Sequence, residues 1–189
     1  MQRFERIDVL TIVSGEQQAY ESVLDIPSEH FDSVMKTNVY ALCWLVKAAL
    51  PHMHPGASII AIASIQVYQP APLLVDYAAT KAAINTTSKS LDQQLAPKGI
   101  RVNIVAPGPI WTRLQVSGSQ PTEALPDFGA QTPLGRPGQP AERAPAYVLL
   151  ASAESSYDSG ETLGVTVGMP TPDSRPQYAQ STSDQTTSQ

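Results

Sequence analysis

The chain contains 189 residues, of which 42% are apolar, so it can bury one hydrophobic core. Its formal net charge is −5 and 15% of its residues are charged, which argues against a surface for nucleic acid or anionic membranes. Cys43 is the one cysteine, which excludes an internal disulfide, and no stretch has the apolar length of a transmembrane helix. We expect a soluble, cytoplasmic protein.

The first third of the chain predicts two strands with a long helix between them. Residues 6–13 are apolar and rich in β-branched side chains, as in a buried parallel strand. After a polar loop, Ser28 can cap a helix with helically spaced apolar residues over 28–53. A second buried strand is expected over 57–63, and it ends at Ser64.

The middle of the chain continues the alternation. A helix is expected over 76–95, ended by Pro97-Lys98-Gly99, and a third strand over 100–105. Residues 112–139 are rich in Gly, Pro, Ser and Gln and show no periodicity. An irregular stretch of that length inside a compact domain is typical of a functional lid.

The last part predicts one more helix and strand. The helix starts near Pro140, because proline suits the first helical position, whereas Pro145 should disturb it. A fourth strand is expected over 162–167. Residues 171–189 are mostly polar and predict a disordered tail, which leaves 1–170 as a single domain.

Alternating strands and helices indicate an α/β fold with a parallel sheet, in which active sites lie at the carboxyl ends of the strands. Gly15, Ser64 and the Pro107-Gly108 pair each follow a predicted strand. We therefore expect these residues at one edge of the sheet, close to each other.

Tyr77 and Lys81 are four residues apart, so they share one face of the helix over 76–95. A nearby ammonium stabilises a phenolate and lowers its pKa, which would make Tyr77 a proton-transfer group. Ser64 could polarise a carbonyl beside the phenol, and the Asn38 amide could hold a water against Lys81. Residues 106–112 offer free backbone groups and a hydroxyl.

These residues resemble the short-chain dehydrogenase/reductase superfamily, in its glucose/ribitol-dehydrogenase-like branch. The resemblance covers about residues 7–170 and is carried by three segments, Ser64-Ile65-Gln66-Val67-Tyr68-Gln69-Pro70, Asp76-Tyr77-Ala78-Ala79-Thr80-Lys81 and Gly135-Arg136-Pro137-Gly138-Gln139-Pro140. It implies the C-terminal half of a doubly wound, Rossmann-like sheet with flanking helices.

The resemblance also implies roles. Tyr77 would be the catalytic acid/base, Ser64 would orient the substrate oxygen, and Asn38 would complete a proton relay. Lys81 would lower the pKa of Tyr77 and bind the nicotinamide ribose. The implied contacts to NADP or NAD further include Gly15, Pro107, Gly108, the Ile110 backbone and the Thr112 hydroxyl. The implied reaction is hydride transfer between a secondary alcohol and a carbonyl.

The chain also departs from the family pattern. No Gly-rich turn precedes Ile7, so the site that normally holds the cofactor pyrophosphate is missing and the chain looks N-terminally truncated. Ile12-Val13-Ser14-Gly15 replaces the usual Asn-Asn-Ala-Gly. Tyr157-Asp158-Ser159-Gly160 and Val165-Thr166-Val167-Gly168 also differ from the usual segments. Without a neighbouring strand, the strand over 7–13 would lie at an exposed edge.

Other residues support no further site. His52 and His54 flank Met53, but no Cys or carboxylate cluster accompanies them, so we expect no metal site. Cys43 lies in an apolar stretch and is expected to be a core thiol, and Glu16-Gln17-Gln18 a solvated loop. Tyr68 and Trp111 could line a substrate pocket or serve ordinary packing.

Two functions other than an oxidoreductase for a small alcohol or carbonyl remain open. The chain could be a non-catalytic homologue that forms a homo-oligomer or pairs with a full-length relative, since in the family the two long helices commonly build the subunit interface. It could also be a degenerate gene product, which an in-frame Gly-rich turn in the DNA upstream of Met1 would test.

Overall fold

The computed structural model describes residues 5–118 and 125–169. Four strands, β1 (Ile7–Ile12), β2 (Met53–Ile62), β3 (Arg101–Pro107) and β4 (Thr162–Val165), form one sheet in the order β1-β2-β3-β4. All three pairings are parallel, so every strand ends at the same edge of the sheet. The α/β, Rossmann-like architecture expected from the alternation is confirmed.

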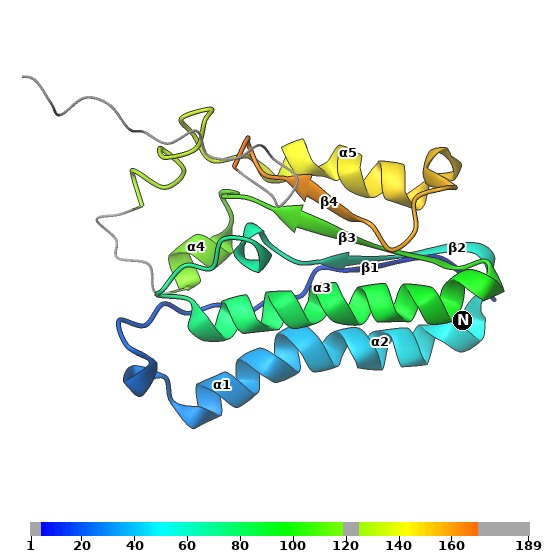
Figure 1. Ribbon diagram of the computed structural model, residues 1–189, viewed down its shortest axis with the longest axis horizontal. Helices are drawn as coiled ribbons and strands as arrows, with labels where there is room; N and C mark the ends of the chain where they lie inside the picture. The colour runs from blue at the N-terminus through cyan, green and yellow to red at the C-terminus, as the bar shows by residue number, and fades with distance from the viewer. Residues whose placement is uncertain (1–4, 119–124, 170–189) are drawn as a thin grey trace, which may run out of the picture.

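Helices cover both faces of the sheet (Figure 1). Helix α2 (Ala41–Ala49) and helix α3 (Val75–Leu95) lie on one face, and α5 (Pro140–Ala151) lies on the other. The central strand β2 supplies both cores by alternation: Ile59 packs with the residues of α2 and α3, whereas Ile60 packs with α5 through Leu150. The apolar runs read from the sequence are thus buried on both faces, as in other parallel sheets.

The long first helix is interrupted. It consists of α1 (Ser28–Met35), a π-helical segment η2 (Lys36–Tyr40) and α2, and a 3₁₀ turn η3 (Leu50–His52) follows. Ser28 is the first helical residue rather than the cap, which is Pro27. The regular helix ends before Met53 because Pro51 has no N–H for a helical bond. The second strand consequently begins at Met53, four residues earlier than predicted.

Two further predictions for the C-terminal part need correction. Helix α5 continues through Pro145 without a break. Proline removes one bond to the carbonyl of Ala141, and both residues are exposed, so solvent can replace that bond. The stretch over 112–139 is not wholly irregular, since it contains the short helix α4 (Arg113–Ser117). Its residues 119–124, and the predicted tail over 171–189, lie outside the described residues.

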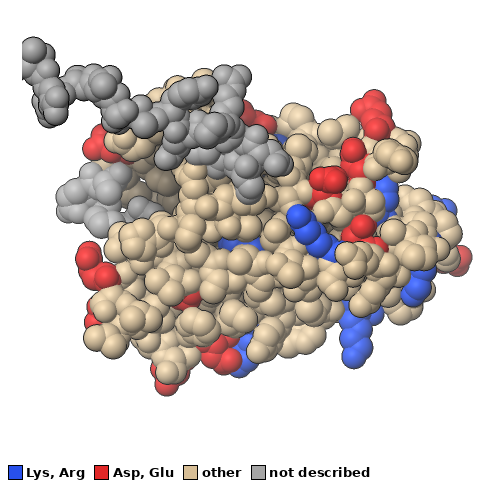
Figure 2. All heavy atoms as spheres, viewed as in Figure 1, with Lys and Arg blue, Asp and Glu red and all other residues tan. Residues whose placement is uncertain are grey.

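Short 3₁₀ turns complete the connections: η1 (Val23–Asp25), η4 (Ile65–Val67), η5 (Ala96–Lys98) and η7 (Ala153–Ser155). Gly99 closes η5 with φ +72°, which confirms the predicted helix stop. Across the described ranges, no helix is both long and apolar enough to span a membrane. Figure 2 shows acidic and basic side chains interspersed on the visible face, with neither sign covering it.

Strand β1 lies at the edge of the sheet, as expected, because among the described strands it pairs with β2 alone. The side chains of Val9, in this strand, and of Val13, just after it, are 40% and 55% exposed, whereas that of Ile12 is in the core. Cys43 is also exposed, so the prediction of a core thiol is wrong, although Leu42 and Val46 of the same helix are buried.

Introducing a charge on this edge should reduce self-association. Lysine on an edge strand opposes pairing with a second chain, so Val9→Lys should lower the fraction of any oligomer that forms through this edge. The free energy of unfolding should change by less than about 1 kcal/mol, because Val9 is already 40% exposed. Light scattering after size-exclusion chromatography measures the effect. Val148→Lys, on the exposed side of α5, is the matched control, and an equal effect of both variants would contradict the prediction.

Candidate functional site

Ser64 and Tyr77 meet at the carboxyl edge of the sheet. Ser64 lies two residues beyond the end of β2 and caps η4, where its Oγ accepts a hydrogen bond from the Gln66 N–H at 3.3 Å. Tyr77 is in the first turn of α3 and is 7% exposed. The Ser64 side chain hydrogen-bonds to the Tyr77 hydroxyl, so the two groups can address one substrate oxygen.

Lys81 lies one helical turn further along and is almost completely buried, with 2% of its surface exposed. Its Nζ lies 5.3 Å from the centroid of the Tyr77 ring and donates a hydrogen bond to the Ile62 carbonyl at 3.3 Å. No carboxylate among the described residues forms a salt bridge with Lys81. Its positive charge can therefore act on the Tyr77 phenol and on a group bound beside it.

Burial controls the pKa values of both groups. It lowers the pKa of Lys81 from 10.5 to about 8. It also raises the pKa of Tyr77, against the smaller lowering effects of the hydrogen bond to Ser64 and the charge of Arg143. The lowering of this pKa that the resemblance implies for Lys81 stays a prediction. Desolvation of the phenolate outweighs these stabilising effects, and Tyr77 is neutral at pH 7.

Asn38 belongs to the π-helical segment η2 and is 1% exposed. Its Oδ1 accepts the Glu16 N–H at 2.7 Å, and its Nδ2 donates to the Glu16 carbonyl at 3.0 Å and to Thr80 Oγ1 at 2.9 Å. Both Nδ2 protons are thus used in bonds to protein groups, and Oδ1 accepts one bond; the expected role of the amide in holding a water against Lys81 stays a prediction. The amide joins the loop after β1 to helix α3.

Gly15 and Gly108 have different surroundings. A Cβ atom at Gly15 would lie 3.7 Å from the Lys81 Nζ, so this glycine forms part of the surface over the ammonium. A Cβ at Gly108 would lie 2.9 Å from the carbonyl oxygen of Thr166 and 3.1 Å from its Cα. Gly108 follows Pro107, the last residue of β3, and its closest neighbour is the backbone after β4.

These surroundings predict a contrast between two alanine variants. Gly108→Ala should destabilise the protein by about 2 kcal/mol or more, because the Thr166 backbone must move. Gly15→Ala makes only an ordinary contact and should change stability by less than about 1 kcal/mol. Urea denaturation of both proteins measures this contrast, and equal losses would contradict it.

Ile110 and Thr112 follow this turn. The Trp111 N–H donates to the Gly138 carbonyl at 2.8 Å, and the Gly138 N–H donates to the Pro109 carbonyl at 2.9 Å. In this parallel bridge the backbone groups of Ile110 itself point to the opposite side and stay available. Thr112 is the N-cap of α4, but its hydroxyl makes no capping bond.

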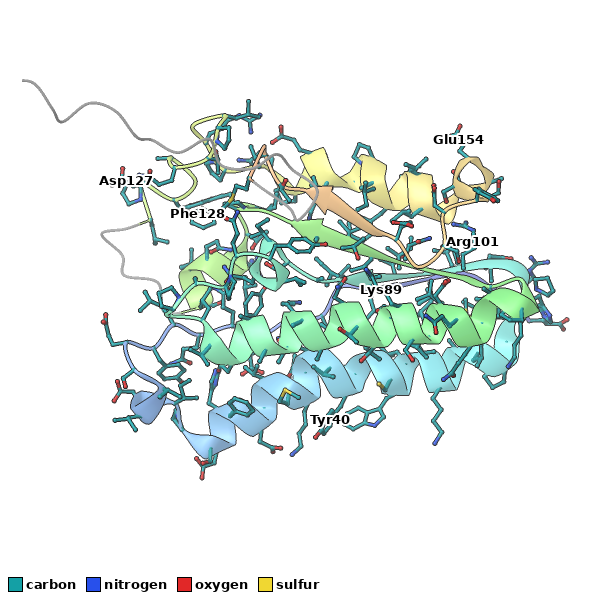
Figure 3. All side chains as sticks on the ribbon, in the orientation of Figure 1. Tyr40, Lys89, Arg101, Asp127, Phe128 and Glu154 are labelled. Carbon is teal, nitrogen blue, oxygen red and sulfur yellow. The ribbon has the colours of Figure 1, made fainter. Side chains whose placement is uncertain are left out.

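The loop beyond α4 reaches back to this region. The ring of Phe128 packs against that of Trp111, with centroids 5.9 Å apart. Figure 3 shows Phe128 and Asp127 at the end of the molecule toward which β3 and β4 point. Packing with Phe128 thus accounts for Trp111, and 39% of its surface remains exposed.

Several residues near the site were not predicted. Gln17 is 7% exposed and Glu16 is hydrogen-bonded, so the expected solvated loop is wrong. His30 lies between Glu16 and Asp76. Arg143 of α5 influences Tyr77 from the other face of the sheet. Of these contacts, only the one between Asp76 and Tyr77 joins neighbouring residues. The others join segments far apart in the chain, so the local sequence could not reveal them.

Comparisons with known proteins agree on the family. A family model described as Enoyl-(Acyl carrier protein) reductase matches residues 1–170. The chain is 56% identical over 162 residues to an uncharacterized oxidoreductase, YghA, of Escherichia coli K12, and 46% identical over 160 residues to a glucose and ribitol dehydrogenase of Daucus carota. These matches cover 86% and 85% of this chain but 55% of each relative.

Solved structures give the same result. A glucose/ribitol dehydrogenase of Brucella melitensis superposes with a TM-score of 0.75 at 33% identity, over 89% of this chain and 66% of that one. An aldohexose dehydrogenase of Thermoplasma acidophilum superposes with a TM-score of 0.80 at 27% identity, over 93% and 73% of the two chains. The chain spans about half the length of the curated relatives that it matches. With its Ser64–Tyr77–Lys81 grouping at the strand ends, it belongs to the short-chain dehydrogenase/reductase family.

Proposed function

We propose that residues 1–170 form a catalytic domain that transfers hydride between NADP or NAD and a secondary alcohol or carbonyl. One observation carries this proposal: Ser64 and Lys81 flank the buried Tyr77 at the carboxyl edge of a parallel sheet. Ligands of open α/β sheets bind at this edge. The family's use of NAD or NADP supports the choice of cofactor.

In this proposal each side chain has one task. The Tyr77 hydroxyl exchanges a proton with the substrate oxygen, and Ser64, which hydrogen-bonds to that hydroxyl, holds the oxygen beside it. The Lys81 ammonium stabilises negative charge that develops on the phenol and the substrate oxygen. Asn38 holds the backbone of the loop after β1 and the Thr80 hydroxyl in place.

The residues present fit the nicotinamide end of such a cofactor. Gly15 places backbone without a side chain next to the Lys81 ammonium, the Ile110 backbone groups face away from their own bridge, and the Thr112 hydroxyl makes no cap bond. Lys81 would bind the ribose, and Ile110 and Thr112 would bind the carboxamide. Pro107 and Gly108 would fix the turn that presents them. The bound cofactor supplies the hydride.

The pKa of Tyr77 favours one direction of reaction. Because burial raises this pKa, Tyr77 carries its proton at pH 7 and can donate it to an alkoxide as a carbonyl is reduced. Oxidation of an alcohol needs the phenolate instead, which burial disfavours. Carbonyl reduction is therefore the direction to assay near neutral pH.

The test is a reduction assay at 340 nm with NADH and NADPH. Because two relatives are named for glucose, ribitol or aldohexose, the substrates should include aldonolactones, the oxidised partners of aldohexoses, and the ketoses that correspond to ribitol and similar polyols. Consumption of reduced cofactor by the wild type, and none by Tyr77→Phe, would support the proposal. Equal rates for the two proteins would refute it.

A second function, as an interaction partner, is favoured by the exposed apolar surface. The β1 edge exposes Val9 and Val13, and the helix formed by α1, η2 and α2 exposes Tyr40 and Trp44 at 43% and 59%. These two rings contact each other edge to face at 5.7 Å. Pairing with a second copy or a full-length relative would cover this surface. Co-expression followed by size-exclusion chromatography distinguishes the two functions, because a cofactor-binding monomer would contradict the second.

A further inference from the structure

Glu16, in the loop after β1, is held by both its backbone and its side chain. The Asn38 amide binds the N–H and the carbonyl of Glu16, at 2.7 Å and 3.0 Å. The carboxylate accepts hydrogen bonds from Ser33 Oγ and Thr37 Oγ1, each at 3.0 Å. This carboxylate is therefore fixed beside the first turns of the helix that begins with α1.

His30 links this carboxylate to a second one. Its Nδ1 lies 3.7 Å from Glu16 Oε1 and its Nε2 lies 3.3 Å from Asp76 Oδ2. The His30 side chain is 14% exposed and that of Asp76 is 1% exposed. The same Nε2 and Oδ2 atoms are buried and make no hydrogen bond of good geometry within the described residues. The His30 nitrogen and the Asp76 oxygen therefore face each other at 3.3 Å without another hydrogen-bond partner among the described residues.

The chain of contacts closes on Tyr77. Asp76 Oδ1 accepts the backbone N–H of Tyr77 at 2.7 Å, and Thr80 Oγ1 donates to the Tyr77 carbonyl at 2.7 Å. The same Thr80 hydroxyl accepts from Asn38, which holds Glu16. The result is a ring of six residues, Glu16, Asn38, Thr80, Tyr77, Asp76 and His30, with both backbone groups of Tyr77 inside it.

We propose that His30 is a positioning residue for Tyr77 and that it acts as an imidazolium between Glu16 and Asp76. A neutral imidazole has one N–H and can present it to only one carboxylate, whereas the protonated ring presents an N–H and positive charge to both. Without that charge, the buried Asp76 carboxylate would lie near Glu16 with no cation between them, which is costly. The protonated His30 therefore closes the ring of contacts.

The other groups that face His30 agree with a positive ring. Tyr20 packs against the imidazole with centroids 5.4 Å apart. Burial raises the pKa of Tyr20, and the charges of Asp76 and Glu16 raise it further, so the phenol stays neutral. The loop after β1 and helix α3 thus each place one carboxylate beside His30, Glu16 and Asp76. The helix that carries His30 contributes the Ser33 and Thr37 hydroxyls, which donate to Glu16.

The ring also places Gly15, the residue before Glu16, above the Lys81 ammonium. Opening the link at His30 should loosen this loop and the first turn of α3 together. A functional consequence for turnover rests on the proposed oxidoreductase activity. The link itself does not, and it can be measured without cofactor or substrate.

The first experiment is nitrogen NMR of the imidazoles in the unmodified protein, with its three histidines assigned. At pH 6 His30 should carry protons on both ring nitrogens, and Asp76→Asn should reduce the fraction of His30 that does so, with no change at His54. His54 is on an exposed part of β2 and serves as the internal control. A singly protonated His30 in the wild type at pH 6 would overturn the proposal.

The second experiment is amide hydrogen exchange in His30→Gln. Exchange of the Glu16 and Tyr77 amide protons should both accelerate by about tenfold or more, since ring opening frees both ends. The matched control is Ser33→Ala, which loses a contact to Glu16 but none to Asp76, and its Tyr77 amide should be unaffected. A folded His30→Gln protein with unchanged exchange at Tyr77 would overturn the proposal, whether or not the protein is an oxidoreductase.

Discussion

Tyr77→Phe should lower kcat/KM for carbonyl reduction by a factor on the order of 10³, the middle of the range for loss of a positioned proton-transfer group. The variant keeps the ring, which is buried in α3 at 7% exposure, and removes only the hydroxyl that Ser64 contacts. The free energy of unfolding should therefore fall by about 1 kcal/mol, the typical net value of one hydrogen bond.

Steady-state kinetics and urea denaturation of the same preparations separate these two effects. Tyr68→Phe is the matched control, because Tyr68 lies four residues after Ser64 at the end of η4 and is partly exposed. That variant should keep more than about half of the activity, since it lacks a proton-transfer role. A Tyr77→Phe protein with nearly full kcat/KM would show that another group transfers the proton.

Lys81→Met should make the protein more stable below pH 8. Burial of the ammonium lowers its pKa from 10.5 to about 8, and each unit corresponds to about 1.4 kcal/mol, so the charge costs about 3 kcal/mol of stability. Met keeps the length of the side chain without the charge. The same substitution should abolish carbonyl reduction, because the cation beside Tyr77 is lost.

The pH dependence has a definite sign. Between pH 8 and 10.5 the unfolded chain holds the Lys81 proton while the folded protein has released it, so the stability of the wild type rises with pH in this window. The advantage of Lys81→Met should therefore be largest below pH 8 and shrink as the pH approaches 10.5. Denaturant unfolding of both proteins between pH 7 and 10 measures this difference. A variant less stable than the wild type at pH 7 would show that Lys81 stabilises the fold.

The strands and their order could be predicted because each has a local signature. Residues 59–62 and 104–106 are continuous apolar runs, and turns with Gly or Pro separate their strands from the helices. Boundaries were less predictable. The extension of β2 back to Met53 depends on pairing with Ile7, and the survival of α5 depends on the exposure of Pro145; neither is visible in the local sequence.

The site divides in the same way. Tyr77 and Lys81 share a helix face, so their proximity followed from spacing alone. The contacts of Asn38 could not be predicted in this way, because Asn38 is 22 residues from Glu16 and 42 residues from Thr80 in the sequence. The pKa of Tyr77 also depends on the balance between burial and charge, which only the packed structure reveals. The exposure of Cys43 similarly reflects the face of α2 that packing selects.

Fluorescence titration of the purified chain with NADH and NADPH tests most directly whether the described residues form a nicotinamide-dependent site. Saturable binding of at least one cofactor is predicted, with energy transfer from Trp111, which precedes Thr112. Thr112→Val should weaken that binding several-fold, since its hydroxyl is proposed to contact the carboxamide. If neither cofactor changes the fluorescence up to millimolar concentration, the account of this site is contradicted.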